Sequence, residues 1–201
     1  MKGYYFITDA KLSRAGNESD VRAAVASGVP AVQYRCKEAP SAALYAEAAR
    51  LRALCRGPLF LVNDRVDIAL AVDADGVHIG QDDLPFAAAR KLLGPKKIIG
   101  LTVHDVAEAV EGEKIGADYL GISPIFATGT KEDAGPPAGL ERIRQIRAAV
   151  KLPLIAIGGI TLANAPEVIK AGADSVCAIS AVVCAADART EMEKFQRLFL
   201  K

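Results

Sequence analysis

The sequence lacks an excess of charge and lacks any long hydrophobic run. Its 25 basic and 24 acidic side chains leave a formal net charge of +1. Because binding to nucleic acid or to an anionic membrane depends on clustered positive charge, we expect neither partner. No apolar run reaches the ~18 residues that a membrane-spanning helix needs. The N-terminal stretch Met1–Thr8 also lacks the apolar segment and cleavage site of a signal peptide.

Cysteine is scarce, and its spacing contains no C-x-x-C pair. The four cysteines are Cys36, Cys55, Cys177 and Cys184, and each falls in an apolar or helical context. This pattern indicates reduced core residues rather than disulfides or zinc ligands. We therefore expect a cytoplasmic protein.

No linker rich in serine, proline or glycine divides the chain. Hydrophobic residues make up 51% of the sequence and charged residues 24%, which is enough for a large core beneath a normal solvated surface. We therefore expect a single compact domain over residues 1–201.

A short apolar run followed by a segment of helical period occurs eight times. The runs are apolar nearly throughout instead of alternating, which is typical of strands covered on both faces in a parallel sheet. The expected strands are Tyr4–Thr8, Ala31–Arg35, Leu59–Asn63, Gly76–Gly80, Ile98–Val103, Tyr119–Phe126, Leu154–Ile160 and Ser175–Ala181. The expected helices include Ser41–Cys55, Val66–Val72, Val106–Lys114, Leu140–Val150 and Asn164–Ala171.

Eight strand–helix units can form a closed barrel or an open, doubly wound sheet. At 201 residues the chain allows about 25 residues per unit, near the lower limit for a (β/α)₈ barrel. Polar loops follow every run, and no G-x-G-x-x-G turn follows the first one, as it would in a dinucleotide-binding sheet. We therefore predict an α/β protein with the (β/α)₈, or TIM-barrel, fold.

In such a barrel the active groups lie at the carboxyl ends of the strands. Gln33, Arg35 and Lys37 alternate along the second run and so share one face. Two cations and an amide on an inner face favour an anionic ligand such as phosphate. The alternative is that these cations pair with Glu38 or other carboxylates of the chain.

Carboxylates follow the third and fourth runs. Asn63-Asp64 ends the third, and Asp82-Asp83 follows the fourth. Two carboxylates, completed by water and phosphate oxygens, form a common Mg²⁺ site. The alternative for both Asp64 and Asp83 is a helix N-cap, with Pro85 opening the second helix.

Phosphate-binding groups follow the last three runs. Thr128, Thr130 and Lys131 supply two hydroxyls and one positive charge after the sixth run. Gly158-Gly159 exposes backbone N–H groups after the seventh, and Ile179-Ser180 lies in the eighth. The loops after strands seven and eight form the customary phosphate pocket of this fold. The alternatives are an ordinary surface loop and a tight glycine turn.

The two histidines do not indicate covalent chemistry. His78 lies within an apolar run and is interpreted as a satisfied core or rim histidine. His104 precedes Asp105 at a helix start, where it could shape a site or belong to a helix cap. No Ser–His–Asp or Cys–His arrangement is present, so the expected chemistry is electrostatic and metal-assisted.

Several of these segments together resemble the thiamine phosphate synthase family. The matching motifs run in order over nearly the whole chain: Tyr5–Asp9, Q-x-R-x-K at Gln33–Lys37, N-D at Asn63-Asp64, G-V-H-I-G-Q-x-D ending at Asp83, G-x-[ST]-x-H at Gly100–His104, T-x-T-K at Thr128–Lys131, A-I-G-G-I at Ala156–Ile160 and the late Ile179-Ser180. The resemblance implies a (β/α)₈ barrel enzyme that joins a pyrimidinylmethyl diphosphate to a thiazole phosphate, with or without a carboxyl group, and releases diphosphate.

The resemblance also implies a role for each matching residue. The pyrimidine substrate would contact Gln33, Tyr34, Arg35, Cys36, Lys37, Asn63, Thr102 and Lys131. The thiazole phosphate would contact Thr128, Gly129, Thr130, Gly159, Ile179 and Ser180. Asp64 and Asp83 would bind Mg²⁺, and Asp83 is chosen over Asp82 on this resemblance alone. Arg35, Lys37 and Lys131 would act in catalysis on the leaving diphosphate.

Three residues depart from the family pattern. Thr102 replaces the usual serine, Ser123 stands where glycine is common, and Ala127 stands where proline is common. None of these changes removes a charge. Two alternative functions are a thiazole tautomerase from a sister family, which typically carries a histidine near the end of strand six, and a non-catalytic barrel that binds phosphate or thiamine. The expected partners are small phosphorylated molecules, and the sequence indicates no particular oligomeric state.

Overall fold

Eight parallel strands close into a barrel in the computed structural model, which describes residues 1–130 and 135–200. Each strand pairs with its neighbours in sequence, and β8 pairs with β1 to close the ring. The strands are β1 Gly3–Ile7, β2 Ala31–Tyr34, β3 Leu59–Asn63, β4 Gly76–Ile79, β5 Ile98–Val103, β6 Tyr119–Ile122, β7 Leu154–Ile157 and β8 Ser175–Cys177. The predicted (β/α)₈ fold is confirmed.

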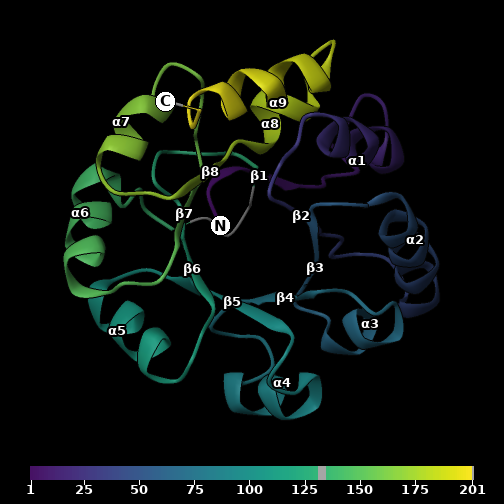
Figure 1. Cartoon of the computed structure of the whole chain (residues 1–201), viewed down its shortest axis with the longest axis horizontal. Helices are drawn as coiled ribbons and strands as arrows, with labels where there is room; N and C mark the ends of the chain where they lie inside the picture. The colour runs from purple at the N-terminus through teal and green to yellow at the C-terminus, as the bar shows by residue number, and fades with distance from the viewer. Residues whose placement is uncertain (131–134, 201) are drawn as a thin grey trace.

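Helices surround the ring of strands (Figure 1). They are α1 Asn17–Ala26, α2 Ser41–Leu54, α3 Val66–Ala71, α4 Phe86–Leu93, α5 Val106–Lys114, α6 Gly139–Ala149, α7 Ala165–Lys170, α8 Ile179–Val183 and α9 Ala188–Arg197. Their apolar faces cover the outside of the barrel, which explains why the strands are apolar on both faces. None of the described helices is long and apolar enough to cross a membrane.

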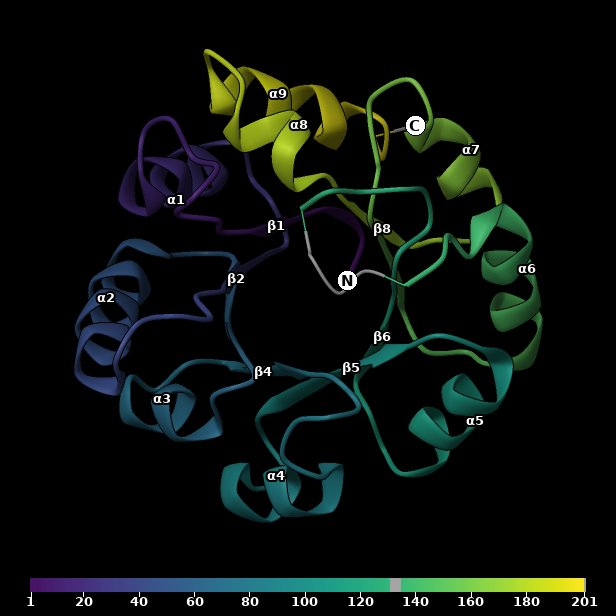
Figure 2. The same ribbon diagram turned by 180° about the vertical axis from the view of Figure 1, so that it is seen from behind.

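Strand β6 ends earlier than predicted, at Ile122. The predicted strand continued to Phe126, but Ser123–Pro124 is a cis peptide bond and Pro124 has no N–H to donate to a sheet. Ile125 and Phe126 still donate to the carbonyl oxygens of residues 157 and 158, at 2.9 and 3.0 Å. The segment after β6 therefore stays against the end of β7 and leads over the end of the barrel near β8 (Figure 2).

The predicted eighth strand was also too long. It covered Ser175–Ala181, whereas β8 ends at Cys177 and residues from Ile179 form the short helix α8. The buried residues of α8 are Ile179, Val182 and Val183, which lie on one helical face at spacings of three and four. Because a short apolar run fits a buried strand and a buried helix equally well, the sequence did not separate them.

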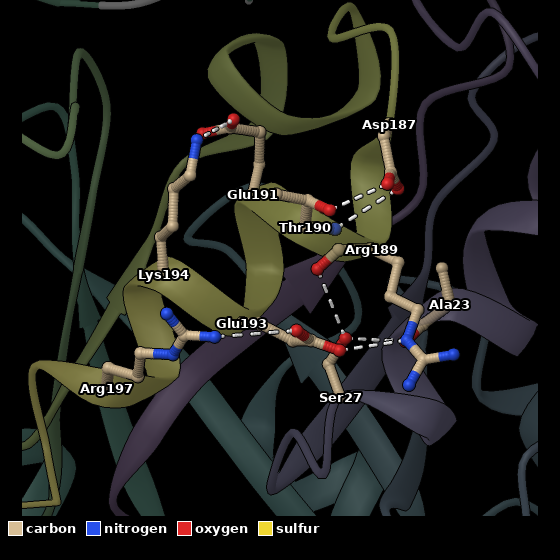
Figure 3. Close-up of polar contacts among 9 residues, drawn as sticks. All are labelled: Ala23, Ser27, Asp187, Arg189, Thr190, Glu191, Glu193, Lys194 and Arg197. Atoms are coloured by element: carbon tan, nitrogen blue, oxygen red, sulfur yellow. Dashed lines mark hydrogen bonds and ion pairs between the residues drawn. The ribbon is translucent and has the colours of Figure 1, made fainter.

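Helix α9 closes the outer layer against α1 (Figure 3). Ser27 Oγ, at the end of α1, donates to Ala23 O at 2.8 Å and lies 3.4 Å from the carbonyl oxygen of Arg189. Gln196 makes the connection to the barrel, because its Oε1 accepts from Tyr4 N at 2.5 Å and its Nε2 donates to Gly28 O at 2.6 Å. Phe195 stacks on the ring of Tyr4 with centroids 5.1 Å apart.

An aspartate directly precedes β4, β6 and β8, at the amino-terminal end of the barrel, and makes the same contacts each time. Its carboxylate accepts the backbone N–H of the preceding strand and a guanidinium N–H from a helix. We call these contacts the base clamps: Asp75 with Phe60 N and Arg52, Asp118 with Ile99 N and Arg90, and Asp174 with Leu154 N and Arg147. The clamps stabilise the end of the ring opposite the carboxyl ends of the strands.

Two glycines on neighbouring strands make room for rings inside the barrel. A Cβ at Gly100 would lie 2.0 Å from the Tyr119 ring, and one at Gly121 would lie 2.9 Å from the His78 ring. These strands therefore need glycine because the interior is filled by side chains from their neighbours. Of the cysteines, Cys55 and Cys177 are buried as expected, whereas Cys36 is half-buried and Cys184 is exposed; none of the four forms a disulfide.

Candidate active site

A pocket opens at the carboxyl ends of β6, β7 and β8. Its empty space, counted together with the part open to solvent, is about 380 Å³. Most of the residues expected to bind the thiazole phosphate line it, although they come from three separate loops: Thr128, Thr130, Gly159, Ile179 and Ser180. The structure therefore brings this predicted set together, and it adds Ser123, Cys177 and Ile157 to the lining.

The glycine pair at the end of β7 shapes this pocket. Gly158 and Gly159 have φ angles of 99° and 63°, a region that side chains other than glycine rarely adopt. A Cβ at Gly159 would also lie 2.6 Å from the carbonyl oxygen of Ala127. On the facing loop, Thr128 Oγ1 accepts the N–H of Thr130 at 3.2 Å. Backbone and hydroxyl groups thus line a pocket whose hydrogen-bond donors suit a phosphate ester.

A cation and two carboxylates meet at the ends of β2, β3 and β4. Lys37 Nζ donates to Asp64 Oδ2 at 2.6 Å. Burial raises the pKa of the Asp64 carboxyl; the bond from Lys37 opposes this shift, and the adjacent Asp83 carboxylate adds to it. Two like charges lie side by side here, which is the arrangement that a divalent cation relieves.

Neither carboxylate caps a helix, so the capping alternative was wrong. Helix α3 begins at Val66 with Arg65 at its N-cap, and α4 begins at Phe86 with Pro85 at its N-cap, in both cases without a side-chain capping bond. Asp64 instead has a φ of 60°, and Asp83 Oδ2 accepts the N–H of Gly80 at 2.7 Å. Asp82 is exposed. Asp83, not Asp82, therefore faces Asp64.

The donor set fits Mg²⁺ better than a metal held by protein side chains alone. No group of three or more histidine, cysteine, aspartate or glutamate side chains with metal-binding geometry occurs in the part of the chain that the structure describes. Mg²⁺ commonly takes only one or two carboxylates and completes its shell with water and substrate phosphates. Asp64 and Asp83 match that requirement.

The Gln33–Lys37 segment points its groups in two directions. Strand β2 ends at Tyr34, and Gln33 is buried inside the barrel. Arg35 is half-buried just beyond the strand, where its backbone N–H donates to Thr8 Oγ1 at 3.0 Å. Glu38 pairs with Lys11 rather than with Arg35 or Lys37. Among the described residues, none forms an ion pair with Arg35.

Tyr34 and Cys36 face outward, between the barrel and its helices. Tyr34 donates through its hydroxyl to Glu47 Oε2 of α2 at 2.7 Å. Both side chains line a smaller hollow of about 180 Å³, together with Leu44, Val62, Asn63, Arg65 and Ile68. Substrate contacts of Tyr34 and Cys36 would therefore come from their backbone groups. Asn63 is half-buried at the end of β3.

Both histidines have local partners. His78 is buried, with Nδ1 2.9 Å from Tyr119 Oη and Nε2 2.9 Å from Thr102 Oγ1, so its interpretation as a satisfied core histidine is confirmed. His104 is exposed and pairs with Glu108 Oε2 at 3.0 Å. The cap of α5 is Asp105, which accepts the N–H of Glu108 at 2.9 Å.

Tyr5 and Tyr119 are interior residues that the sequence analysis did not select. Their hydroxyls lie 2.8 Å apart, and Gln33 Nε2 donates to Tyr5 Oη at 2.8 Å. Both tyrosines sit within apolar runs and so resembled ordinary core residues. The glycines at positions 100 and 121 were the available signal, because they mark strands that leave interior volume to neighbouring rings. Lys131, the third predicted catalytic cation, lies outside the described residues.

Comparison with known proteins matches this arrangement to one family. The family model described as "Thiamine monophosphate synthase" matches residues 4–182. The chain is 55% identical over 193 residues to the thiamine-phosphate synthase of Methanosarcina barkeri, covering 96% of this chain and 88% of that protein. It is 49% identical over 197 residues to that of Chloroflexus aurantiacus, covering 96% of this chain and 91% of that protein.

A solved structure agrees in both sequence and fold. The thiamine phosphate pyrophosphorylase from Pyrococcus furiosus superimposes with a TM-score of 0.90 at 44% identity, and the match covers 98% of this chain and 94% of that one. With a polar pocket and paired carboxylates at one mouth of the barrel, this chain belongs to the thiamine monophosphate synthase family.

Proposed function

We propose that the chain is a transferase that joins 4-amino-2-methyl-5-pyrimidinylmethyl diphosphate to a thiazole phosphate, forming thiamine monophosphate and diphosphate. The observation that carries this proposal is the placement of two unlike anion sites at the carboxyl ends of one barrel. The pocket of Thr128, Gly159 and Ser180 suits a phosphate ester. The group of Lys37, Asp64 and Asp83 suits a diphosphate with its metal ion.

The diphosphate end of the pyrimidine substrate is proposed to bind beside β2, β3 and β4. Arg35 offers a planar fork of N–H donors for phosphate oxygens, and Lys37 offers a mobile point charge. Lys131 is proposed to bind the same diphosphate from the loop after β6. Tyr34, Cys36 and Asn63 would border this substrate, the first two through their backbone.

Asp64 and Asp83 are proposed to hold Mg²⁺. When bound, the ion would neutralise charge on the diphosphate oxygens, which is its usual role in phosphate-binding sites. The raised pKa of Asp64 supports the proposal, because it reflects a carboxylate that is partly buried next to another carboxylate. Lys37 supplies one positive charge to Asp64, and a second cation would balance Asp83.

The reaction breaks the bond between the pyrimidinyl methylene carbon and the diphosphate oxygen, and the electron pair leaves with the diphosphate. The thiazole nitrogen then supplies the electron pair for the new carbon–nitrogen bond. The positive side chains stabilise the leaving group, while the electron-rich aminopyrimidine stabilises the methylene cation between the two steps. No proton has to be removed from the attacking nitrogen, so the site needs no general base. This is consistent with both histidines being engaged locally.

The thiazole phosphate is proposed to bind in the pocket between β6, β7 and β8. Its phosphate would accept from the Thr128 and Thr130 hydroxyls, the backbone of Gly129 and Gly159, and the first residues of α8, Ile179 and Ser180. These groups are polar and uncharged, whereas the diphosphate site is cationic. The difference matches one substrate with a single phosphate and another with two.

The tautomerase alternative has less support. The end of β6 carries Ser123 and Pro124, whereas the chain's histidines are His78 on β4 and His104 directly after β5. A barrel that only binds phosphate would have no need for two adjacent carboxylates beside a lysine. The presence of four cysteines that form no disulfide supports the proposal that the protein works in the reducing cytoplasm.

Diphosphate release tests the proposed function directly. Purified protein should release diphosphate only when both substrates and Mg²⁺ are present, and thiamine monophosphate should form in equal amount. Chelation of the metal should stop both products. Turnover of the thiazole precursor without the pyrimidine substrate would instead support the tautomerase, and binding without product would support the non-catalytic barrel.

A further inference from the structure

A chain of hydrogen bonds crosses the interior of the barrel beneath its mouth. It begins at Gln33 on β2 and passes through Tyr5 on β1, Tyr119 on β6 and His78 on β4 to Thr102 on β5. Each donor–acceptor distance lies between 2.8 and 2.9 Å. Its two ends, Gln33 and Thr102, are residues proposed to contact the pyrimidine substrate. The three inner members have no role in the reaction as described so far.

The protons along this chain can be placed by elimination. Gln33 Nε2 is only a donor, so Tyr5 Oη accepts from it. Among the described residues the Tyr5 hydroxyl contacts only Gln33 and Tyr119, so its own proton goes to Tyr119 Oη. Tyr119 Oη already accepts a proton from Tyr5 Oη, so the Tyr119 hydroxyl donates its own proton to His78 Nδ1.

The result determines the tautomer of His78. With Nδ1 accepting, a neutral imidazole carries its proton on Nε2 and donates it to Thr102 Oγ1. The Thr102 hydroxyl proton is then free to be donated to a ligand. Burial raises the pKa of both Tyr5 and Tyr119 above the ordinary tyrosine value, so each keeps the single proton that this assignment requires.

Packing holds the chain in this geometry. The Tyr119 ring stacks on His78 with centroids 5.4 Å apart and lies 5.9 Å from the Tyr5 ring. Gly100 and Gly121 leave no space beyond that filled by these rings, since a Cβ at either position would overlap Tyr119 or His78. A rotated imidazole would lose both of its bonds, and buried polar groups without partners are costly.

We propose that His78, Tyr5 and Tyr119 are positioning residues that hold Thr102 as a hydrogen-bond donor to the substrate ring. Thr102 is half-buried at the carboxyl end of β5, at the mouth. A hydroxyl that must donate suits a ring nitrogen with a lone pair, as an aminopyrimidine presents, and disfavours an N–H at the same position. The structure thus assigns a role in substrate selection to a buried histidine that acts on the substrate ring through one intervening residue, Thr102. This inference rests on the proposed function for the identity of the ring.

The tautomer can be measured without any substrate. The imidazole nitrogen signals of ¹⁵N-labelled protein distinguish a protonated from an unprotonated ring nitrogen, and a His104→Gln variant assigns the two histidines. We expect unprotonated Nδ1 and protonated Nε2 at His78 at neutral pH. Protonated Nδ1, or a doubly protonated ring, would overturn the proposal, because the chain would then run in the opposite direction or not be neutral.

Variants test whether the direction matters for the reaction. Tyr119→Phe removes the donor to Nδ1, so a second tautomer should appear at His78. Tyr4→Phe, which removes an equally buried hydroxyl bonded to Ala178 O, should leave the tautomer unchanged.

Thr102→Val should lower kcat/KM for the pyrimidine diphosphate by about tenfold, and Thr102→Ser should restore it to within about threefold. Equal kcat/KM in Thr102→Val and the unaltered protein would remove Thr102 from substrate selection.

The two kinds of measurement keep the inference separate from the proposed function. If no diphosphate is released under any condition but the expected tautomer is found, the proposed reaction fails and the hydrogen-bond direction stands. If turnover is normal but His78 carries its proton on Nδ1, the reaction stands and the positioning role fails.

Discussion

The ammonium group of Lys37 lies 2.6 Å from Asp64 Oδ2, on a carboxylate whose other neighbour is Asp83. Lys37 and Asp64 are 27 positions apart and come from the ends of adjacent strands. Without substrate, Lys37 therefore occupies part of the position where a divalent cation is proposed to bind. With substrate, the same ammonium can turn to the diphosphate, since 53% of its side chain is exposed.

Lys37→Met should change metal binding and turnover in opposite directions. Loss of the competing ammonium should tighten Mg²⁺ binding to the substrate-free protein by up to about fivefold, the range of an exposed ion pair. Turnover should fall about a hundredfold or more, because a preorganised contact to the leaving group is lost. Calorimetric titration with Mg²⁺ and a diphosphate assay measure the two effects. Lys11→Met, which breaks the neighbouring pair with Glu38, is the matched control and should change neither.

Asp83→Asn should abolish most Mg²⁺-dependent turnover, with a loss of about a hundredfold or more. The amide can still accept the N–H of Gly80, so the fold should be retained and the loss should reflect the missing charge. Asp82→Asn removes an exposed carboxylate one position away and should leave turnover within about twofold. Equal losses in the two variants would contradict the assignment of Asp83 over Asp82.

Ser180→Ala should affect one substrate and spare the other. Its hydroxyl lines the pocket proposed for the thiazole phosphate, so removing it should raise the KM for that substrate by about fivefold, the usual value of one hydrogen bond. The KM for the pyrimidine diphosphate should not change. Steady-state kinetics with each substrate varied in turn provides the test. A rise only in the KM for the pyrimidine diphosphate would contradict the assignment of Ser180 to the thiazole phosphate pocket.

Lys131→Ala should reduce turnover strongly without reducing stability. The expected loss is about a hundredfold or more if Lys131 binds the leaving diphosphate. Thermal unfolding should be unchanged, which separates a loss of chemistry from a loss of folded protein. Unaltered turnover would exclude Lys131 from the mechanism.

Asp118→Ala should do the reverse and lower stability while sparing catalysis. It leaves the buried N–H of Ile99 and the guanidinium of Arg90 without their shared acceptor. The expected cost is about 1–3 kcal/mol, and each kcal/mol should lower Tm by about 2–4 °C in a protein of this size. Glu111→Ala, which breaks only the surface pair with Lys114, should lower Tm by less than about 1 °C. Calorimetry compares the two variants, and turnover well below Tm should match that of the unaltered protein.

Much of the fold could be predicted because it depends on local patterns. Apolar runs between amphipathic segments gave the eight strands, and β3 and β5 have the predicted bounds. The errors at β6, β7 and β8, each predicted too long, share a cause, since the apolar character continues into Ile125, Ile160 and Ile179 after the strand has ended. Burial continues there in a loop and in a helix, and an apolar run does not report which structure buries it.

The site was predicted less completely because its contacts are not local. The position of Arg35 and Lys37 at a strand end followed from their spacing, but the choice of Asp64 as the partner of Lys37 depends on how β2 and β3 align. Tyr5 and Tyr119 are 114 residues apart in sequence and meet across the ring. Only the closed barrel makes that contact, so no pattern in either run could indicate it.

The base clamps have a consequence for how this sequence can diverge. Each clamp joins residues within one short span, 52–75, 90–118 or 147–174, and the loops that follow β2, β4, β6 and β8 fall between or outside these spans. Those loops carry Lys37, Asp83 and Thr130, whereas Asp64, Thr102 and Gly159 lie inside the spans. Insertions or exchanges in the loops between the spans would leave every clamp intact, so the substrate preference can change there without loss of the ring.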